Sequence, residues 1–261
     1  MQALRIAATG MAAQQMRVDV TSNNIANMTT AAYDARRAEF ADLHYQRLRM
    51  PGTVTAVTGE QVPAGVQMGL GVRPSAVAVE LEQGALRPTG NDLDLAIEGR
   101  GYFEVQLPNG ESAFTRDGAF KVSGEGQVVT SLGYPLVDDI TVPEEARSVE
   151  ITADGLVFAR FDDAVEPQEI GAITLVGFLN EKGLEAMGDN LFRETGASGA
   201  PLPGEPGLDG RGTLRQGYLE ESSVDVVAEI TELIEAQRGY ELNARVMSAA
   251  DEMLSATTRI R

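Results

Sequence analysis

The feature that most constrains this chain is the distribution of its glycines and prolines. Residues 1–28 and 218–261 contain no proline and one glycine each, Gly10 and Gly239, whereas all 11 prolines and the remaining 26 glycines lie between them. Glycine and proline weaken helices and are typical of turns. The partition therefore predicts two helical ends around a turn-rich interior.

Both ends also carry an apolar stripe with the period of a packed helix. Apolar and small residues recur at alternating spacings of four and three over residues 4–25 and again over 226–258. This heptad spacing predicts two long helices packed as a coiled-coil-like pair. Asn27, which tolerates a left-handed backbone, is expected to end the first helix. Ser222 and Asp225 have the spacing of a capping box that would start the second.

The stripes are weak, because Ala, Ser, Gln, Thr and Asp occupy several of their positions. One interpretation is an intramolecular helix pair that covers the β-rich interior. The other is that the stripes are buried against other copies, since an exposed apolar stripe needs a partner. On the second interpretation, eleven stripe residues would contact other copies: Leu4, Ala8, Met11, Val18, Ile25, Val226, Ile230, Leu233, Tyr240, Met247 and Leu254.

The interior has the pattern of a β-rich domain. Apolar residues alternate with polar ones over residues 93–97. Turn signals at Pro108-Asn109-Gly110, Asp117-Gly118 and Ala153-Asp154-Gly155 separate short strand-like runs. Frequent short strands of this kind favour an antiparallel sandwich or open barrel.

We therefore expect an α+β fold with long terminal helices, an antiparallel β-rich central domain and an extended β or loop segment between them. The expected division has three regions: a terminal helical core of residues 1–30 with 222–261, a connecting region of residues 31–85 with 208–221 that includes an extended segment at 47–67, and a β-rich outer domain at 86–207.

The charge balance argues against nucleic acid as a partner. The chain has 21 basic and 39 acidic residues, for a net charge of −18. Such a surface repels a phosphate backbone, and its simplest role is solubility. No window of about 18 apolar residues occurs, so direct membrane insertion is not expected.

The residues offer little for catalysis or metal binding. There is no cysteine, so thiolate chemistry is excluded. His44 is the only histidine, so a catalytic serine triad would have to use it. Asp92 and Asp94 lack calcium-loop spacing and are expected on the solvent side of a strand. Gly99 and Gly101 lack the third glycine of a dinucleotide site and are expected in turns. We predict no catalytic, cofactor-binding or metal-binding residue.

Several stretches along essentially the whole chain resemble the bacterial flagellar rod and hook family. They occur in the family's order and are long enough to be specific. The matching stretches are residues 7–15, 19–27, 37–43, 93–103, 114–120, 212–220 and 233–243.

The resemblance implies a structural subunit and no enzyme. Family members polymerise with themselves into a helical tube in the basal body. The implied partners are proximal rod subunits, hook subunits, the surrounding L- and P-ring proteins and the flagellar type III export apparatus. The first residues lack the pattern of a cleaved secretion signal, and the family is exported to the periplasmic rod without one.

Within the family, the length of 261 residues and the segment at 47–67 resemble subunits of the distal rod, the drive shaft that transmits torque from motor to hook. That segment is expected to bridge neighbouring copies and stiffen the tube. Two departures from the family pattern are Ala32, where glycine is common, and Gly239, where alanine is common.

Three alternatives remain open from the residues. The nearest is a paralogous proximal-rod or hook-type subunit. The second is a β-sandwich binding module or enzyme with helical extensions, which predicts a stable monomer with a ligand pocket. The third is a coiled-coil oligomer of fixed size, which predicts a closed assembly that does not grow.

Overall fold

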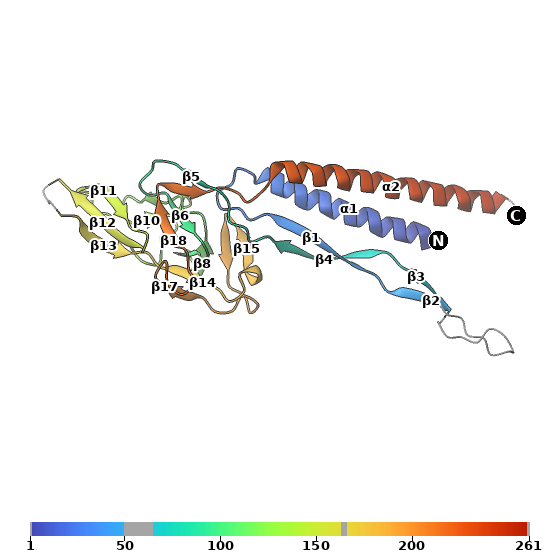
Figure 1. Cartoon of the computed structure of the whole chain (residues 1–261), viewed down its shortest axis with the longest axis horizontal. Coiled ribbons are helices and arrows are strands. Elements are labelled where there is room, and N and C mark those ends of the chain that lie inside the picture. The colour runs from blue at the N-terminus through green and yellow to red at the C-terminus, as the bar shows by residue number, and fades with distance from the viewer. Residues whose placement is uncertain (1, 50–64, 163–165, 260–261) are drawn as a thin grey trace. The chain divides into compact units, whose positions relative to one another are not determined.

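A computed structural model describes residues 2–49, 65–162 and 166–259. The chain forms two compact units, which we call the helical unit and the β unit (Figure 1). The helical unit comprises residues 1–26, 36–80 and 225–261, and the β unit comprises residues 27–35 and 81–224. The division into three regions stays a prediction.

The helical unit confirms both terminal helices. Helix α1 spans Gln2–Ala26 and helix α2 spans Val226–Arg259. They lie side by side and run antiparallel, so the chain ends lie at the same end of this unit (Figure 1). Neither described helix is both long and apolar enough to cross a membrane.

A long antiparallel hairpin completes the helical unit. Strand β1 (Arg36–Asp42) pairs with β4 (Val72–Val79), and β2 (Tyr45–Arg49) pairs with β3 (Val66–Gly69). Helix α1 contacts both β1 and β4. Residues 47–49 and 66–67 of the predicted extended segment lie in β2 and β3, while its residues 50–64 lie outside the described residues.

The helix boundaries confirm one sequence prediction and correct another. The side chain of Asp225 accepts hydrogen bonds from the backbone N–H groups of Val227 and Ala228 at 2.9 and 3.2 Å, so Asp225 itself is the N-cap of α2. The predicted capping box starting at Ser222 is wrong. The predicted end of α1 at Asn27 is confirmed, because α1 ends at Ala26. In the turn that follows, Ala32 has a left-handed backbone with φ of 51°. A glycine would adopt that backbone without strain.

The β unit contains fifteen described strands and one short 3₁₀ helix at Glu181–Gly183. The strands are β5 Leu86–Pro88, β6 Leu95–Glu98, β7 Phe103–Gln106, β8 Ser112–Thr115, β9 Lys121–Val122, β10 Val128–Val129, β11 Ala146–Ile151, β12 Leu156–Phe161, β13 Gln168–Ala172, β14 Leu175–Gly177, β15 Glu185–Gly188, β16 Leu191–Arg193, β17 Leu202–Gly204, β18 Thr213–Gln216 and β19 Tyr218–Glu220.

The described strands pair antiparallel, as predicted, but they do not form one large sandwich or barrel. The largest sheet has the order β15-β16-β8-β7, the next has the order β11-β12-β13, and the others are pairs. Aliphatic side chains around Phe103 and Phe120 fill the main core. Tyr102, Phe114, Val176 and Phe178 form a second, mostly aromatic cluster.

The run at residues 93–97 departs from the predicted alternation. Asp94, Leu95, Ala96 and Ile97 are all buried, because β6 pairs with β18 and both of its faces are covered. The expectation that Asp92 and Asp94 share a solvent-facing side is therefore wrong. Only Asp92 is exposed, while Asp94 is 7% exposed and its carboxylate accepts a hydrogen bond from the Asn91 amide.

Two of the three turn signals are confirmed and one is wrong. Gly110 turns the chain from β7 into β8, and Gly155 turns it from β11 into β12, both with positive φ. At Asp117-Gly118 no hairpin forms, because β8 pairs with β7 and β16. The Gly118 carbonyl instead accepts a hydrogen bond from the Leu95 N–H at 3.0 Å.

Close backbone approach explains Gly118 and gives a first prediction. A Cβ at this position would overlap the Leu95 carbonyl oxygen. We expect Gly118→Ala to lower the free energy of unfolding of the β unit by roughly 1–3 kcal/mol, the usual cost of overpacking. Urea denaturation measures the change. Gly124→Ala is the control, because its Cβ would meet no atom within 4 Å, and an equal loss in both variants would contradict the argument.

Candidate assembly site

The two helices meet through small and polar residues. Gly10 of α1 faces the side-chain amide of Asn243, and Gly239 of α2 faces that of Gln14. A Cβ added at Gly10 would lie 2.8 Å from Asn243 Oδ1, and one added at Gly239 would lie 2.9 Å from Gln14 Cδ. At each glycine, a side-chain amide of the other helix fills the space that a Cβ would occupy. The helix axes can therefore approach closely.

Polar contacts continue this seam toward the start of α2. Asn24 is buried, and its amide nitrogen donates to Glu229 Oε1 and to the backbone oxygen of Arg36, both at 2.8 Å. Its amide oxygen accepts from the Arg36 N–H. Arg17 and Glu232 form an ion pair at 3.7 Å. Asn24 therefore ties α1, α2 and β1 together.

The seam lies one residue before the predicted apolar stripe on both helices. Its members are Ala7, Gly10, Gln14, Arg17, Thr21 and Asn24 on α1, with Glu229, Glu232, Ala236, Gly239, Asn243 and Ala250 on α2. One residue corresponds to a rotation of about 100° around a helix. The helices pair through their small residues, so the larger apolar side chains are turned out of the seam.

The predicted subunit-packing residues are consequently not buried within the single chain. Eight are partly buried: Leu4, Met11, Val18, Ile25, Val226, Leu233, Met247 and Leu254. Ala8, Ile230 and Tyr240 are exposed. Further large apolar side chains on α2 are also exposed, namely Val227, Ile234, Leu242, Val246 and Met253. The role of the eleven residues in subunit packing stays a prediction.

Val227, Ile230 and Ile234 form one apolar face on α2, which we call the α2 apolar face. Their spacing of three and four residues puts them on one side of the helix, and they are 76%, 46% and 44% exposed. Large side chains this exposed in one row are typical of a surface that another protein covers.

Glu229 gives the helical seam a pH dependence. Burial raises the pKa of its carboxyl, and the negative charges of Glu232 and Glu80 raise it further, while hydrogen bonds from Asn24 and Thr21 oppose the rise. A raised pKa means that the folded state binds the proton more tightly than the unfolded state, so ionised Glu229 destabilises the seam above that pKa.

We therefore expect Glu229→Gln to raise the melting temperature of the helical unit at pH 7.5. The gain should shrink as the pH falls through the raised pKa and Glu229 itself becomes neutral. Helicity measured by circular dichroism during heating tests this. Glu235→Gln, a change on an exposed part of α2, should shift the melting temperature much less, and a Glu229→Gln gain that grows toward low pH would contradict the prediction.

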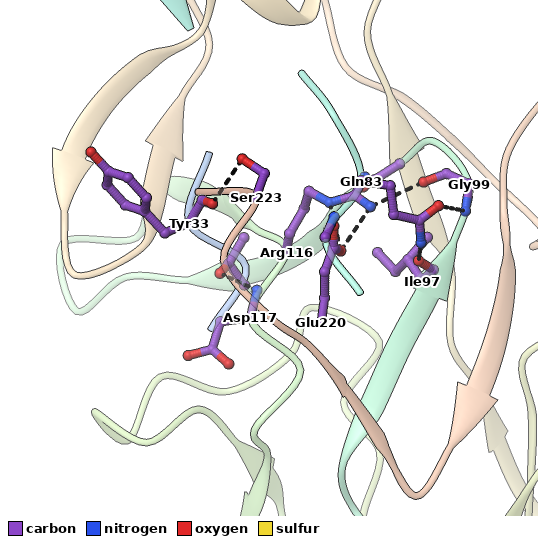
Figure 2. A network of polar contacts seen from close by, with 11 residues as sticks. Tyr33, Gln83, Ile97, Gly99, Arg116, Asp117, Glu220 and Ser223 are labelled. Carbon is purple, nitrogen blue, oxygen red and sulfur yellow. Dashed lines mark hydrogen bonds and ion pairs between the residues drawn. The ribbon is translucent and has the colours of Figure 1, made fainter. Parts of the chain in front are cut away.

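In the β unit, a buried ion pair connects segments far apart in the sequence (Figure 2). The Nε and Nη2 atoms of Arg116 donate to Glu220 Oε2 at 3.1 and 2.8 Å. Arg116 also donates to the carbonyls of Gly101 and Gly99, and Glu220 Oε1 accepts from the Gly84 N–H at 3.0 Å. The two side chains are 9% and 4% exposed, so nearly all their charge is balanced inside the protein.

Other polar contacts in Figure 2 surround this pair. Gln83 donates to the Ile97 carbonyl at 2.7 Å and accepts from the Gly99 N–H at 3.1 Å. The Ser223 N–H donates to the Tyr33 carbonyl at 3.0 Å. Sequence reasoning did not single out Arg116 or Glu220, although both lie in stretches that carry the family resemblance.

The residues that the sequence offered for catalysis or binding lie in separate parts of the fold. His44 is exposed between β1 and β2. Gly99 and Gly101 have φ of 120° and 134°, as their predicted role in turns requires. Within the described residues, no group of His, Asp and Glu side chains is arranged to hold a metal ion. The structure thus defines an α+β protein with two long terminal helices and an exposed apolar face on α2.

Comparison with known proteins identifies the family to which this fold belongs. The chain matches three family models: "Flagella basal body rod protein" at residues 4–33, "Flagellar hook protein FlgE/F/G D1 domain" at 96–159 and "Flagellar basal body rod FlgEFG protein C-terminal" at 215–260. Flagellar basal-body rod proteins FlgG from Caulobacter vibrioides and Agrobacterium fabrum are 51% and 46% identical, over 100% and 99% of both chains. The protein of that name from Buchnera aphidicola (Schizaphis graminum) is 42% identical over 98% of both.

This chain belongs to the flagellar basal-body rod protein FlgG family. It is a structural subunit of the flagellar rod. The resemblance seen in the sequence is thereby confirmed.

Proposed function

We propose that the chain polymerises into a helical tube, the distal rod, in which neighbouring copies cover the terminal helices. The observation that carries this proposal is the offset seam. Gly10 and Gly239 pair the helices through small residues, and the α2 apolar face is left open on the single chain. The eleven predicted packing residues would lie in or beside the contacts between copies.

The energy available from these contacts is substantial. Fully burying an Ile or Val side chain contributes roughly 1.5–3 kcal/mol. Covering the exposed half of Ile230 and Ile234 would thus contribute about 1 kcal/mol each, and every copy repeats the contact. A screw relation between copies gives an open polymer, whereas a two-fold relation would close it into a dimer.

The proposal includes the functional setting that family membership suggests. The tube would act as a drive shaft that transmits torque, without enzymatic activity. Its partners would be proximal rod subunits, hook subunits and the L- and P-ring proteins. The chain would reach this place, in the periplasm, through the flagellar type III export apparatus.

Sedimentation velocity over a concentration series, with electron microscopy of the same samples, tests the proposal. We expect the full chain to change from a monomer to straight tubes above a critical concentration, with short basal-body rods added as nuclei. A single closed oligomer, or a monomer that adds to no nucleus, would refute it.

The hairpin tip offers a separate test of stiffness. We predicted that the segment at 47–67 bridges neighbouring copies. Deleting it should therefore leave assembly possible but shorten the persistence length of the tubes measured in micrographs. If the tubes are as straight as those of the full chain, the bridging role is refuted, but the proposed polymerisation is not.

A further inference from the structure

The two units differ sharply in charge. The β unit contains 27 of the 39 acidic residues but only 10 of the 21 basic ones, a net charge of −17. The helical unit contains the other 12 acidic and 11 basic residues, a net charge of −1. The strongly acidic unit therefore attracts cationic groups.

The arginines of the two units are used differently. In the β unit every arginine forms an ion pair with a carboxylate of the same unit: Arg87, Arg100, Arg116, Arg147, Arg160, Arg193, Arg211 and Arg215. In the helical unit six arginines form no ion pair with a described residue: Arg5, Arg36, Arg47, Arg73, Arg238 and Arg245. A copy of this chain therefore presents guanidinium groups on its helical unit.

The β unit also contains a pocket of about 280 Å³ beside the Arg116–Glu220 pair, which we call the acidic socket. Its lining includes the carboxylates of Asp34, Glu82, Glu181 and Glu220. Such a volume is several times the ~30 Å³ that one water occupies. It has room for the planar end of an arginine side chain.

The positive charges of the two arginines that line the socket are already balanced by carboxylates, so they do not favour binding of an anion. Arg116 directs its donors to Glu220 and to the carbonyls of Gly99 and Gly101. Arg100 is 69% exposed and donates through Nε to Glu181 Oε1 at 2.9 Å. With two of its carboxylates matched by these arginines, the lining has a net charge of −2.

A second, independent feature of the socket is the hydroxyl of Tyr102. Tyr102 is 1% exposed and lines the socket, yet no described residue forms a hydrogen bond with its hydroxyl. The hydroxyl oxygen is not among the fully buried atoms that lack a partner, so a ligand in the socket can reach it. Burial, with the nearby carboxylates of Glu181 and Asp34, raises the pKa of Tyr102 above its usual range, so the hydroxyl stays neutral and its oxygen can accept a proton donor.

We propose that the acidic socket binds the guanidinium group of an arginine presented by the helical unit of a second copy. Tyr102 oxygen and the carboxylates of Glu82 and Glu181 would receive its N–H groups. Guanidinium is favoured over ammonium because its planar fork offers donors in several directions, and because 19 of the 21 basic residues of the chain are arginine. The source of the arginine, but not the binding chemistry, rests on the proposed polymerisation.

Binding of a small probe to the monomeric full chain tests the socket directly. The probe is N-acetyl-arginine amide, with N-acetyl-citrulline amide as its neutral isostere. We expect saturable shifts of the Gly99, Arg100 and Gly101 amide signals in NMR spectra with the arginine probe, and at least ~10-fold weaker binding of the citrulline probe, as expected for a charge-assisted contact. Equal binding of the two probes, or none, would overturn the proposal.

Variants separate recognition from folding. Tyr102→Phe keeps the ring that packs against Phe178 and Phe192 and removes a hydroxyl without a partner, so the fold should persist. Tyr102→Phe and Glu82→Gln should each weaken the arginine probe several-fold. Glu145→Gln, an exposed change outside the socket, should leave binding unchanged. Unaltered binding in both socket variants would place the probe elsewhere and refute the assignment.

A separate measurement tests whether the arginine comes from a second copy. Saturating arginine probe should raise the critical concentration for tube growth, and the citrulline probe should not. If the probe binds but growth is unchanged, a second copy is not the source. If the chain forms no tubes even on nuclei, the proposed polymerisation fails, while the monomer titration still decides whether the socket binds guanidinium.

Discussion

Replacing Ile230 and Ile234 together by aspartate is expected to abolish tube growth while the single chain remains folded. Both side chains are nearly half exposed and lie outside the seam that joins α1 and α2. Assembly would lose about 2 kcal/mol of apolar burial and would also have to desolvate two carboxylates. A loss of about 2.7 kcal/mol raises the critical concentration about 100-fold. Because the lost burial and the desolvation act together, we expect the critical concentration to rise by at least about 100-fold.

The control for this experiment is Ile230→Leu with Ile234→Leu. It keeps the face apolar at nearly the same volume, and we expect its tubes to grow at a critical concentration close to that of the natural chain. Circular dichroism confirms that both variants keep their helices. Tubes that grow from the aspartate variant at unchanged concentration would show that the α2 apolar face is not an assembly contact.

Breaking the buried ion pair of the β unit should have the largest effect on stability. Glu220→Ala would leave the Arg116 guanidinium, 9% exposed, without its carboxylate and would leave the Gly84 N–H without its acceptor. Removing one partner of a buried pair typically costs about 3–5 kcal/mol. We expect the midpoint of the urea transition of the β unit to fall accordingly.

The double variant Arg116→Met with Glu220→Leu tests the cause. It removes both charges and fills much of the same space, and buried pairs replaced in this way often lose little stability. We therefore expect it to recover most of the loss seen in Glu220→Ala. If the double variant is as unstable as the single one, packing and not the unpaired charge determines the effect.

Local sequence patterns predicted the elements of this fold but not the way they pack. The helices were predictable because heptad spacing and the absence of proline are local signals. The seam was not, because the sequence does not reveal that Gly10 and Gly239 would each admit an amide from the other helix. That close approach selects the small residues for the intramolecular contact and shifts the seam by one position.

Burial in the β unit was harder to predict than its turns. Gly110 and Gly155 turn the chain where expected because a two-strand hairpin is a local structure. Asp94 is buried next to β6, which pairs with β18, and its backbone oxygen accepts a hydrogen bond from Gly217, more than a hundred residues later. Arg116 and Glu220 are separated by 104 residues, and with 39 acidic residues in the chain no local pattern identifies which carboxylate meets a given arginine.

The central claim is that the α2 apolar face is open in the single chain and covered in the tube. Because the chain has no cysteine, a thiol introduced by Val227→Cys can be labelled alone with a maleimide, with Glu145→Cys in the β unit as the reference. The account predicts that labelling at 227 slows by at least ~10-fold in tubes relative to monomer, as for a thiol that loses solvent access, and slows far more than at 145. Equal labelling of monomer and tube at 227 would contradict the account.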